Sequence, residues 1–297
     1  MEAFKIAQIA QIASALEVSG HPKPGNVHRN RDFHDMVFED FLISGIAIGE
    51  TIKSVASNAR KNKDNLSKIN IGKYILDGVL ETDKWVQNNT NLGIIMMLVP
   101  ISASAAISSN FNDLQKNIGD ILNATTLDDA INLYQAINIA DAGGMGSQNE
   151  FDVNSSDAIN ELKKNNQTMF DVLEISSSWD KLAYELTHEM EATFNIGFKT
   201  FHKLKSESSL NNSTLATFLT ILSEIPDTLI SRKYGNEISE KVSAMALEVL
   251  NSSDDLFNKN IKDFDNYLFE KKYNPGTTAD LTAASIMLSY LKDEFEK

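Results

Sequence analysis

Apolar residues recur along this chain at intervals of three and four, and segments with the alternating pattern of β-strands are nearly absent. Five apolar residues near the N-terminus show the helical spacing: Ile6, Ile9, Ala10, Ala13 and Leu16. The most apolar segment, residues 92–107, is shorter than the roughly 20 residues that span a membrane and contains Pro100, which favours a buried helix. The pattern predicts an all-α fold.

The same periodicity predicts where the other helices lie. The expected helical segments are 38–60, 71–87, 92–108, 111–123, 127–140, 178–206, 212–230, 238–250, 254–271 and 278–295. The polar segment 149–166 is expected to be a loop. Because no linker clearly divides the chain, we expect residues 1–297 to form a single compact multi-helix domain, with active-site loops at the ends of its helices.

Charge and cysteine content exclude several classes of function. The net charge of −14 disfavours binding to nucleic acids or to anionic membranes. The chain has no cysteine, which excludes disulfides and cysteine-ligated metal sites and is typical of a cytoplasmic protein. The first 20 residues lack a basic segment followed by an apolar block, so they are expected to form an amphipathic helix and not a signal peptide.

Positive charge is concentrated in one loop, residues 21–36, with the sequence HPKPGNVHRNRDFHDM. It contains three of the five histidines of the chain. Prolines on both sides of Lys23 stiffen its backbone, and Gly25 permits a close approach of a ligand to the main chain. This pattern suits phosphate binding, although a basic surface loop that caps the first helix explains it equally well. The pair His34-Asp35 is a candidate catalytic or metal-binding pair, with a structural role as the alternative.

Two further loops carry polar side chains or glycines between predicted helices. In NNTNLG, residues 88–93, amides and a hydroxyl could bind ribose hydroxyls or base edges, or could cap the next helix. The glycine-rich segment 141–153 does not match the G-x-x-x-x-G-K-[ST] phosphate loop, and a helix end followed by a turn explains its glycines. Asp141 and Asp152 are candidate ligands for a hard cation in that segment.

The C-terminal motif NPGTTAD, residues 274–280, predicts a tight turn followed by a helix. Thr277 and Asp280 have the spacing of a capping box, and the helix N-terminus that follows favours an anion. Asp227 and Arg232, in PDTLISRKYG, form another candidate pair. By contrast, His188-Glu189 does not begin a zinc-protease motif, because position 192 is alanine.

Taken together, these loops resemble the triphosphoribosyl-dephospho-CoA synthase family. The matching segments, in the order of the family, are Glu17, PKPGNVH (22–28), HDM (34–36), NTNLG (89–93), Pro100, GG (143–144), RKYG (232–235) and NPGTTADLTAA (274–284). They span nearly the whole chain, and the combination of PKPG with NPGTTADL is specific.

The resemblance implies an all-α transferase that acts on ATP and 3′-dephospho-CoA. In the family's reaction, C1 of the ATP ribose is joined to a ribose hydroxyl of dephospho-CoA and adenine is released. The product is the precursor of the prosthetic group on the acyl carrier subunits of citrate lyase and malonate decarboxylase. Mg²⁺ is expected with the triphosphate.

The resemblance and the chemistry of the reaction together suggest roles for individual residues. The catalytic candidates are Glu17, His28, His34 and Asp35. The candidates for binding substrate and phosphate are Lys23, Gly25, Asn26, Arg29, Asn89, Thr90, Asn91, Arg232, Asn274, Gly276, Thr277 and Thr278. The candidate metal ligands are Asp35, Asp227 and Asp280.

The chain departs from the family at one motif. Many bacterial members carry His-Lys where this sequence has Asn91-Leu92. Alternatives therefore remain open: a related ribosyl transferase or nucleotide-acting enzyme of another cofactor pathway, for example a methanopterin-like one, or a hydrolytic outcome. A helical scaffold without activity is the third hypothesis, and the clustered lysine, histidine and aspartate residues argue against it. The sequence leaves the oligomeric state open, including a homo-oligomer, although the apolar helix around Met96 and Met97 is expected to be core.

Overall fold

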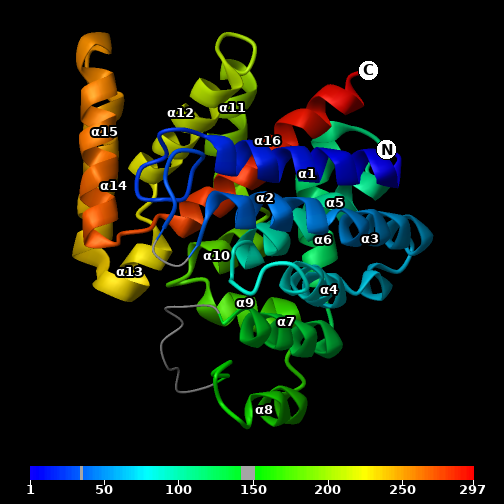
Figure 1. Ribbon diagram of the computed structural model, residues 1–297. Coiled ribbons are helices and arrows are strands. Elements are labelled where there is room, and N and C mark those ends of the chain that lie inside the picture. Colours follow the sequence, from blue (N-terminus) through cyan, green and yellow to red (C-terminus); the bar gives the residue numbers. More distant parts are fainter. Residues whose placement is uncertain (34–35, 142–150) are drawn as a thin grey trace.

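The all-α prediction is confirmed by a computed structural model that describes residues 1–33, 36–141 and 151–297. Within those ranges there is no strand, only an isolated bridge between His28 and Arg31. The helices of Figure 1 are α1 (Ala3–Ser19), α2 (Phe38–Ala47), α3 (Gly49–Lys61), α4 (Ile71–Asp83), α5 (Leu92–Ile107), α6 (Leu114–Asn123), α7 (Leu127–Ala140), α8 (Ala158–Asn165), α9 (Met169–Ser176), α10 (Lys181–Thr187), α11 (Lys199–Leu204), α12 (Leu210–Glu224), α13 (Thr228–Tyr234), α14 (Asn236–Leu250), α15 (Asp254–Lys271) and α16 (Gly276–Phe295). Three shorter elements complete them: the 3₁₀ turns η1 (Leu66–Ile69) and η2 (Phe111–Asp113) and the π-helical segment η3 (Thr193–Phe198).

The main core is built around α5, in which 14 of 16 residues are buried. A helix that is apolar on all sides must be surrounded by other elements, and α5 packs against α1, α3, α4, α6 and α16. Met96 and Met97 are both buried there, which confirms the prediction that this helix is core. None of the described helices is long and apolar enough to cross a bilayer.

A second, smaller apolar cluster lies where α12, α13, α14 and α15 meet. Phe218, Ile230, Phe264 and Leu268 are its largest members. Figure 1 shows α14 and α15 side by side at one edge of the molecule. Because α12 and α16 contribute residues to both clusters, these two helices connect the edge of the molecule to the main core.

The helix predicted over 38–60 is in fact two helices, α2 and α3, which meet at Ile48. The break follows from close packing on α1. A Cβ on Gly45 would lie 2.9 Å from the Cβ of Ser14, and one on Gly49 would overlap the side chain of Gln11. Gln11 also donates a hydrogen bond from Nε2 to the carbonyl of Ile46, at 2.9 Å. The periodicity of the segment contains no sign of these contacts.

The helix predicted over 178–206 is wrong in a similar way. It is broken after α10, where Glu189 and Met190 both have positive φ, and continues as η3 and α11. The buried carboxylate of Glu185 accepts hydrogen bonds from the backbone amides of Ala192 and Thr193, at 3.1 and 2.7 Å. A side chain thus replaces the carbonyls that would continue a regular helix.

The remaining differences are smaller. The segment 212–230 ends as a helix at Glu224 and restarts as α13 after Pro226, and α4 ends at Asp83 and not at residue 87. The predicted loop at 149–166 contains α8, and α9 was not predicted. By contrast, α7 and α15 have the predicted bounds.

Replacing Gly72 by alanine is expected to destabilise the protein by about 1–3 kcal/mol. Gly72 lies where α4 packs on α7, and a Cβ there would overlap the backbone of Asp129, with the carbonyl carbon only 2.6 Å away. Backbone atoms cannot move aside as a side-chain tip can. Urea unfolding measures the effect. Gly78→Ala on the same helix is the matched control, because its Cβ would meet only the side chain of Ile95; equal costs for the two variants would contradict the prediction.

Candidate active site

Several helix ends converge on one cavity of about 470 Å³. It is lined by the C-terminal end of α1, the loop before α5, the start of α10, and the regions around α13 and the N-terminus of α16. Ten of the predicted site residues line it: Glu17, Asn26, Asn89, Thr90, Asn91, Arg232, Asn274, Gly276, Thr277 and Asp280. Residues far apart in the sequence, from α1 to α16, therefore share one cavity.

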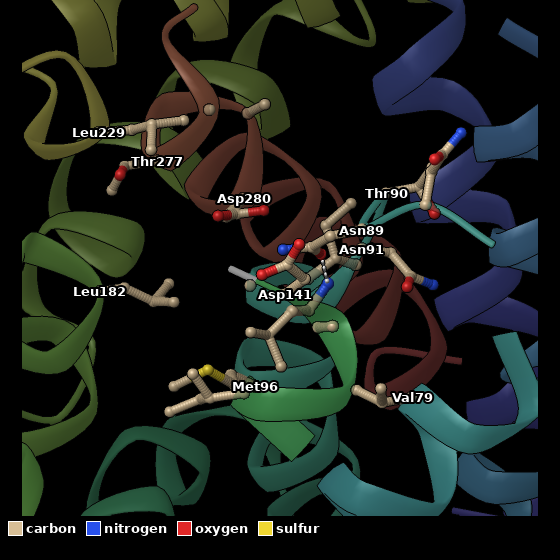
Figure 2. A pocket seen from close by; sticks show the side chains of 18 of the residues that line it. Val79, Asn89, Thr90, Asn91, Met96, Asp141, Leu182, Leu229, Thr277 and Asp280 are labelled. Atoms are coloured by element: carbon tan, nitrogen blue, oxygen red, sulfur yellow. Dashed lines mark hydrogen bonds between the residues drawn. The ribbon is translucent and has the colours of Figure 1, made fainter. Parts of the chain in front are cut away.

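Asp280 presents its carboxylate to the cavity from the second turn of α16. Figure 2 shows it with Thr277 and Leu229 on one side and Asn89 and Asn91 on the other. The carboxylate lies against the first turn of α5 so closely that a Cβ on Gly93 would overlap it. Its oxygens form no hydrogen bond or ion pair with any residue in the described ranges. Asp280 is therefore available to a ligand.

The electrostatic environment of Asp280 opposes its ionisation. Burial raises the pKa of Asp280 well above the usual carboxyl range, and the nearby carboxylates of Glu17, Asp227 and Asp180 raise it further. The guanidinium of Arg232 acts in the opposite direction. Once deprotonated, such a carboxylate is a stronger base than an ordinary aspartate, which is the property that proton abstraction requires.

Lys23 and Glu17 form a buried ion pair behind the cavity. The Lys23 side chain is fully buried, and its ammonium also donates to the Glu17 carbonyl at 3.2 Å. Burial lowers the pKa of Lys23 and raises the pKa of Glu17, while each charge partly offsets the effect on the other. Glu17 reaches the cavity wall, but Lys23 does not, so the structure places Lys23 behind the residues that face the cavity.

Other predicted site residues of the first loop also make contacts within the protein. Gly25 has φ +72°, and a Cβ there would lie 2.5 Å from the carbonyl oxygen of Tyr273. The buried His28 ring lies 3.4 Å from the Asp265 carboxylate, and Arg29 hydrogen bonds to the Asn211 side chain on the surface. These three residues do not line the cavity, and the structure does not bring them together with the ten that do.

The sequence signal in this loop was therefore ambiguous for a physical reason. The backbone amides of His21 and Gly25 and the side chain of Arg31 fasten the loop to α12 and α15. Asn26 is the exception, since it lines the cavity and donates to the Asn274 side chain at 2.7 Å. The predicted pair His34-Asp35 and the glycines at 143 and 144 lie outside the described residues.

The polar loop before α5 is held by its own side chains. The hydroxyls of Thr90 and Ser44 lie 2.5 Å apart, and the Asn91 amide donates to the Thr82 hydroxyl at 3.1 Å. The Asn89 side chain is exposed, and its carbonyl accepts from the Leu92 amide at 3.3 Å. The N-cap residue of α5 is Asn91, but its side chain makes no capping hydrogen bond. Asn89 instead binds the first amide of α5, while Thr90 and Asn91 anchor the loop to α2 and α4.

Asp227 holds two helix N-termini with one carboxylate. One oxygen accepts from the amides of Leu229 and Ile230 at the start of α13, at 2.9 and 3.2 Å. The other accepts from the amide and the hydroxyl of Thr278 in α16, both at 2.8 Å. The predicted capping box between Thr277 and Asp280 is wrong, because Asp227 from another helix performs the capping.

This arrangement also shows how two of the predicted site residues are engaged. Asp227 is buried and absent from the cavity wall, and all four hydrogen bonds of its carboxylate stabilise helix ends. The carboxylate is therefore occupied by backbone and hydroxyl donors and does not face the cavity. Thr278 is likewise buried and directed at Asp227, and not at substrate.

Asp227→Asn is expected to destabilise the protein by about 1–3 kcal/mol. An asparagine can still accept hydrogen bonds on one side, but its amide group would face the donors of Thr278 or of α13 on the other side. The measurement is urea unfolding at neutral pH. Thr278→Val, which removes only the hydroxyl donor, is expected to cost less. If Asp227→Asn costs no more than Thr278→Val, the double-capping role of the carboxylate is contradicted.

Arg232 enters the cavity from α13, where it forms an ion pair with Asp180. Asp180 also caps α10 by accepting from the Leu182 amide at 2.9 Å. Asp180 and Trp179 both line the cavity but were not predicted as site residues. They lie inside the segment 178–206, which was predicted to be one continuous helix. The aspartate two residues before Leu182 was the available signal, since aspartate is favoured at helix N-caps.

The comparison with protein families decides what this cavity belongs to. The model of the ATP:dephospho-CoA triphosphoribosyl transferase family matches residues 3–297.

The chain belongs to this family.

A curated relative and a solved structure agree with that assignment. The relative, from Malonomonas rubra, carries the name of a 2-(5''-triphosphoribosyl)-3'-dephosphocoenzyme-A synthase and is 34% identical over 91 residues. That match spans 29% of this chain and 28% of the relative. The crystal structure, from Archaeoglobus fulgidus, carries the name of a triphosphoribosyl-dephospho-CoA synthase. It has a TM-score of 0.67 at 22% identity and covers 84% of this chain and 98% of its own, which shows the shared fold.

In this member of the transferase family the cavity is acidic. Its described lining includes five carboxylates, from Glu17, Asp83, Asp141, Asp180 and Asp280, and two cationic side chains, from Arg232 and Lys233. Arg232 is already paired with Asp180. A polyphosphate entering this cavity would meet an excess of negative charge, so an accompanying cation would favour its binding.

The described residues contain no group of three or more histidine, cysteine, aspartate or glutamate side chains that could bind a metal ion alone. Mg²⁺ does not require one, because it usually takes one or two carboxylates and completes its octahedron with water and phosphate oxygens. Asp141 lines the cavity beside Asn89 in Figure 2, and its carboxylate hydrogen bonds to none of the described residues. The lining therefore fits a Mg²⁺ ion that arrives with a nucleotide.

Proposed function

We propose that this chain transfers the triphosphoribosyl unit of ATP to a ribose hydroxyl of 3′-dephospho-CoA and releases adenine. The observation that supports this most directly is the convergence of the family's separated motifs on one cavity, around the unpaired carboxylate of Asp280. Helix ends that served only as caps would not need to meet around such a group.

The chemistry requires a base near the acceptor hydroxyl. A bond forms between that hydroxyl oxygen and C1 of the ATP ribose, the bond from C1 to the adenine nitrogen breaks, and the hydroxyl proton goes to the base. Adenine leaves with the electron pair of the broken bond and takes up a proton. C1 acquires oxocarbenium character on the way, as in glycoside hydrolysis.

Asp280 is the base in this proposal. Its carboxylate faces the cavity, lacks a partner among the described residues and has a raised pKa. Glu17 lines the same cavity but is paired with Lys23. The buried carboxylates around Asp280 stabilise the positive charge that develops at C1. Asn89 and Asn274 supply amides for hydroxyls or for the departing base.

Mg²⁺ is the cofactor that we propose with ATP. When bound, it would neutralise phosphate charge inside the acidic cavity. Asp141, whose carboxylate hydrogen bonds to none of the described residues, would hold it, which leaves Asp280 for the proton. Lys233 would contact phosphate oxygens of ATP on the α13 side of the cavity.

Release of adenine tests the function. The protein is incubated with ATP and Mg²⁺, with and without dephospho-CoA, and free adenine is quantified by chromatography. Release that depends on dephospho-CoA is the expected result. Release without acceptor would indicate a hydrolase, and no release under either condition would contradict the proposal. Replacing dephospho-CoA by ADP as the acceptor tests whether the reaction requires the pantetheine arm.

A further inference from the structure

A second cavity of about 470 Å³ lies on the other side of the Asp180–Arg232 ion pair. Trp179, Asp180 and Arg232 line both cavities, whereas Asp280 and the asparagine loop line only the first. The ion pair and the tryptophan therefore form the wall that the two cavities share. Of the family motifs described above, only RKYG contributes to the lining of the second cavity, through Arg232.

Arg232 is held in that wall with donor capacity to spare. One terminal nitrogen binds Asp180, while Nε is buried and has no hydrogen-bond partner. A buried guanidinium donor without a partner is costly unless a ligand supplies an acceptor. A phosphate oxygen located at the boundary between the cavities would be such an acceptor.

The walls of the second cavity differ from those of the first. Hydroxyl groups come from Ser178, Thr228 and Ser231, an amide from Asn236, and apolar surface from Ile225 and Pro226. Such a mixture suits a ligand in which amide groups alternate with methyl and methylene groups. It does not suit a polyphosphate, because Lys181 is already engaged with Glu185, at 3.3 Å.

The size of the first cavity favours a second subsite. About 470 Å³ falls within the range of a site for one drug-sized ligand, and the proposed reaction requires two nucleotides at once. Along dephospho-CoA the order of groups is ribose, diphosphate and pantetheine arm. Along the protein the corresponding order is the Asp280 carboxylate, the Arg232 guanidinium and the second cavity.

We infer that the second cavity binds the pantetheine arm of the acceptor, with Arg232 bound to the diphosphate that joins the two halves. This inference rests on the proposed function and extends it by assigning the acceptor's long arm to residues between α10 and α14. It makes the second cavity the element that distinguishes dephospho-CoA from simpler nucleotides such as ADP.

Obstruction of the cavity tests the inference through kinetics. Asn236→Phe places a ring at an exposed lining position, and Glu237→Phe, which is also exposed but outside the lining, is the matched control. Asn236→Phe is expected to raise KM for dephospho-CoA about tenfold and to leave KM for ATP and for ADP as acceptor unchanged. Equal increases for dephospho-CoA and ADP, or equal effects of the two variants, would overturn the inference.

A binding measurement separates this inference from the proposed function. The chain has two tryptophans, and the side chain of Trp85 is 71% exposed, so Trp85→Phe leaves Trp179 as a reporter in the shared wall. Titration with 4′-phosphopantetheine, which has no ribose and cannot react, is expected to change Trp179 fluorescence, and adding Asn236→Phe is expected to abolish the change. An unchanged signal overturns the subsite even if adenine is released. Absence of adenine release would contradict the function and leave this measurement intact.

Discussion

Asp280→Asn is expected to lower kcat for adenine release by about 100- to 10,000-fold. The substitution keeps the size and polarity of the side chain, but an amide cannot accept the proton of the acceptor hydroxyl. Because Asp280 makes no hydrogen bond to the described residues, the loss of its charge breaks no contact that holds the cavity together. Single-turnover assays with saturating ATP measure the effect on the chemical step.

The pH profile gives the same prediction a second readout. The base must be deprotonated, so kcat/KM is expected to fall as pH drops through the pKa of Asp280. Because burial and three neighbouring carboxylates raise that pKa, the acidic limb is expected at higher pH than for an exposed aspartate. The residual activity of Asp280→Asn is expected to lack this limb.

Stability provides the control for misfolding. A carboxyl whose pKa is raised in the folded state binds more protons there than in the unfolded chain, so its contribution to stability falls as pH rises from the usual carboxyl range to the raised pKa. At neutral pH Asp280→Asn is therefore expected to be at least as stable as the parent protein. Asp83→Asn, at another carboxylate of the cavity, is expected to change kcat only a few-fold. Equal kcat for Asp280→Asn and the parent would rule out Asp280 as the base.

Lys23→Met is expected to destabilise the protein by about 3–5 kcal/mol at neutral pH. Methionine fills a similar volume, so the cost comes from leaving the buried Glu17 carboxylate without its counter-ion. Urea unfolding at constant pH measures this cost. The exposed pair Lys116–Asp120 is screened by solvent, so Lys116→Met is expected to cost much less than Lys23→Met and serves as the control.

A double-mutant cycle distinguishes the loss of charge from the loss of packing. Glu17→Gln combined with Lys23→Met removes both charges and is expected to recover most of the stability. The difference between Lys23→Met and the parent is also expected to shrink as pH falls, because Glu17 then becomes neutral by protonation, and the pKa of Glu17 is already raised by burial. A cost below about 1 kcal/mol, or no recovery in the double variant, would show that the pair is not coupled.

Periodicity predicted the fold class because burial against a helical core imposes it on nearly every segment. It predicted α7 and α15 with their bounds and failed where a tertiary contact ends a helix. The carboxylate of Glu185 replaces helical carbonyls, and Gln11 binds Ile46 at the break between α2 and α3. Gln11 lies in α1 and Glu185 lies in α10, outside the residues at which each predicted helix breaks. The spacing of apolar residues around the breaks could not indicate these contacts.

The candidate site was predicted in outline for a related reason. Motifs at helix ends indicated which loops would meet, but residue type alone could not show which side chains face the cavity. Lys23 and Asp227 looked like ligands and are instead buried partners of Glu17 and of two helix ends. Conversely, Asp180 lay inside a predicted helix and in fact holds Arg232 at the cavity.

The carboxylate of Asp227 has a consequence for how the two halves of the site behave. It fastens the start of α13, which carries Arg232, to the start of α16, which carries Asp280. The spacing between the guanidinium of Arg232 and the carboxylate of Asp280, the proposed base, is thus set during folding, before either nucleotide arrives. Little free energy then has to be spent on rearrangement when substrates bind, so a residue that touches no substrate can still govern the speed of the enzyme.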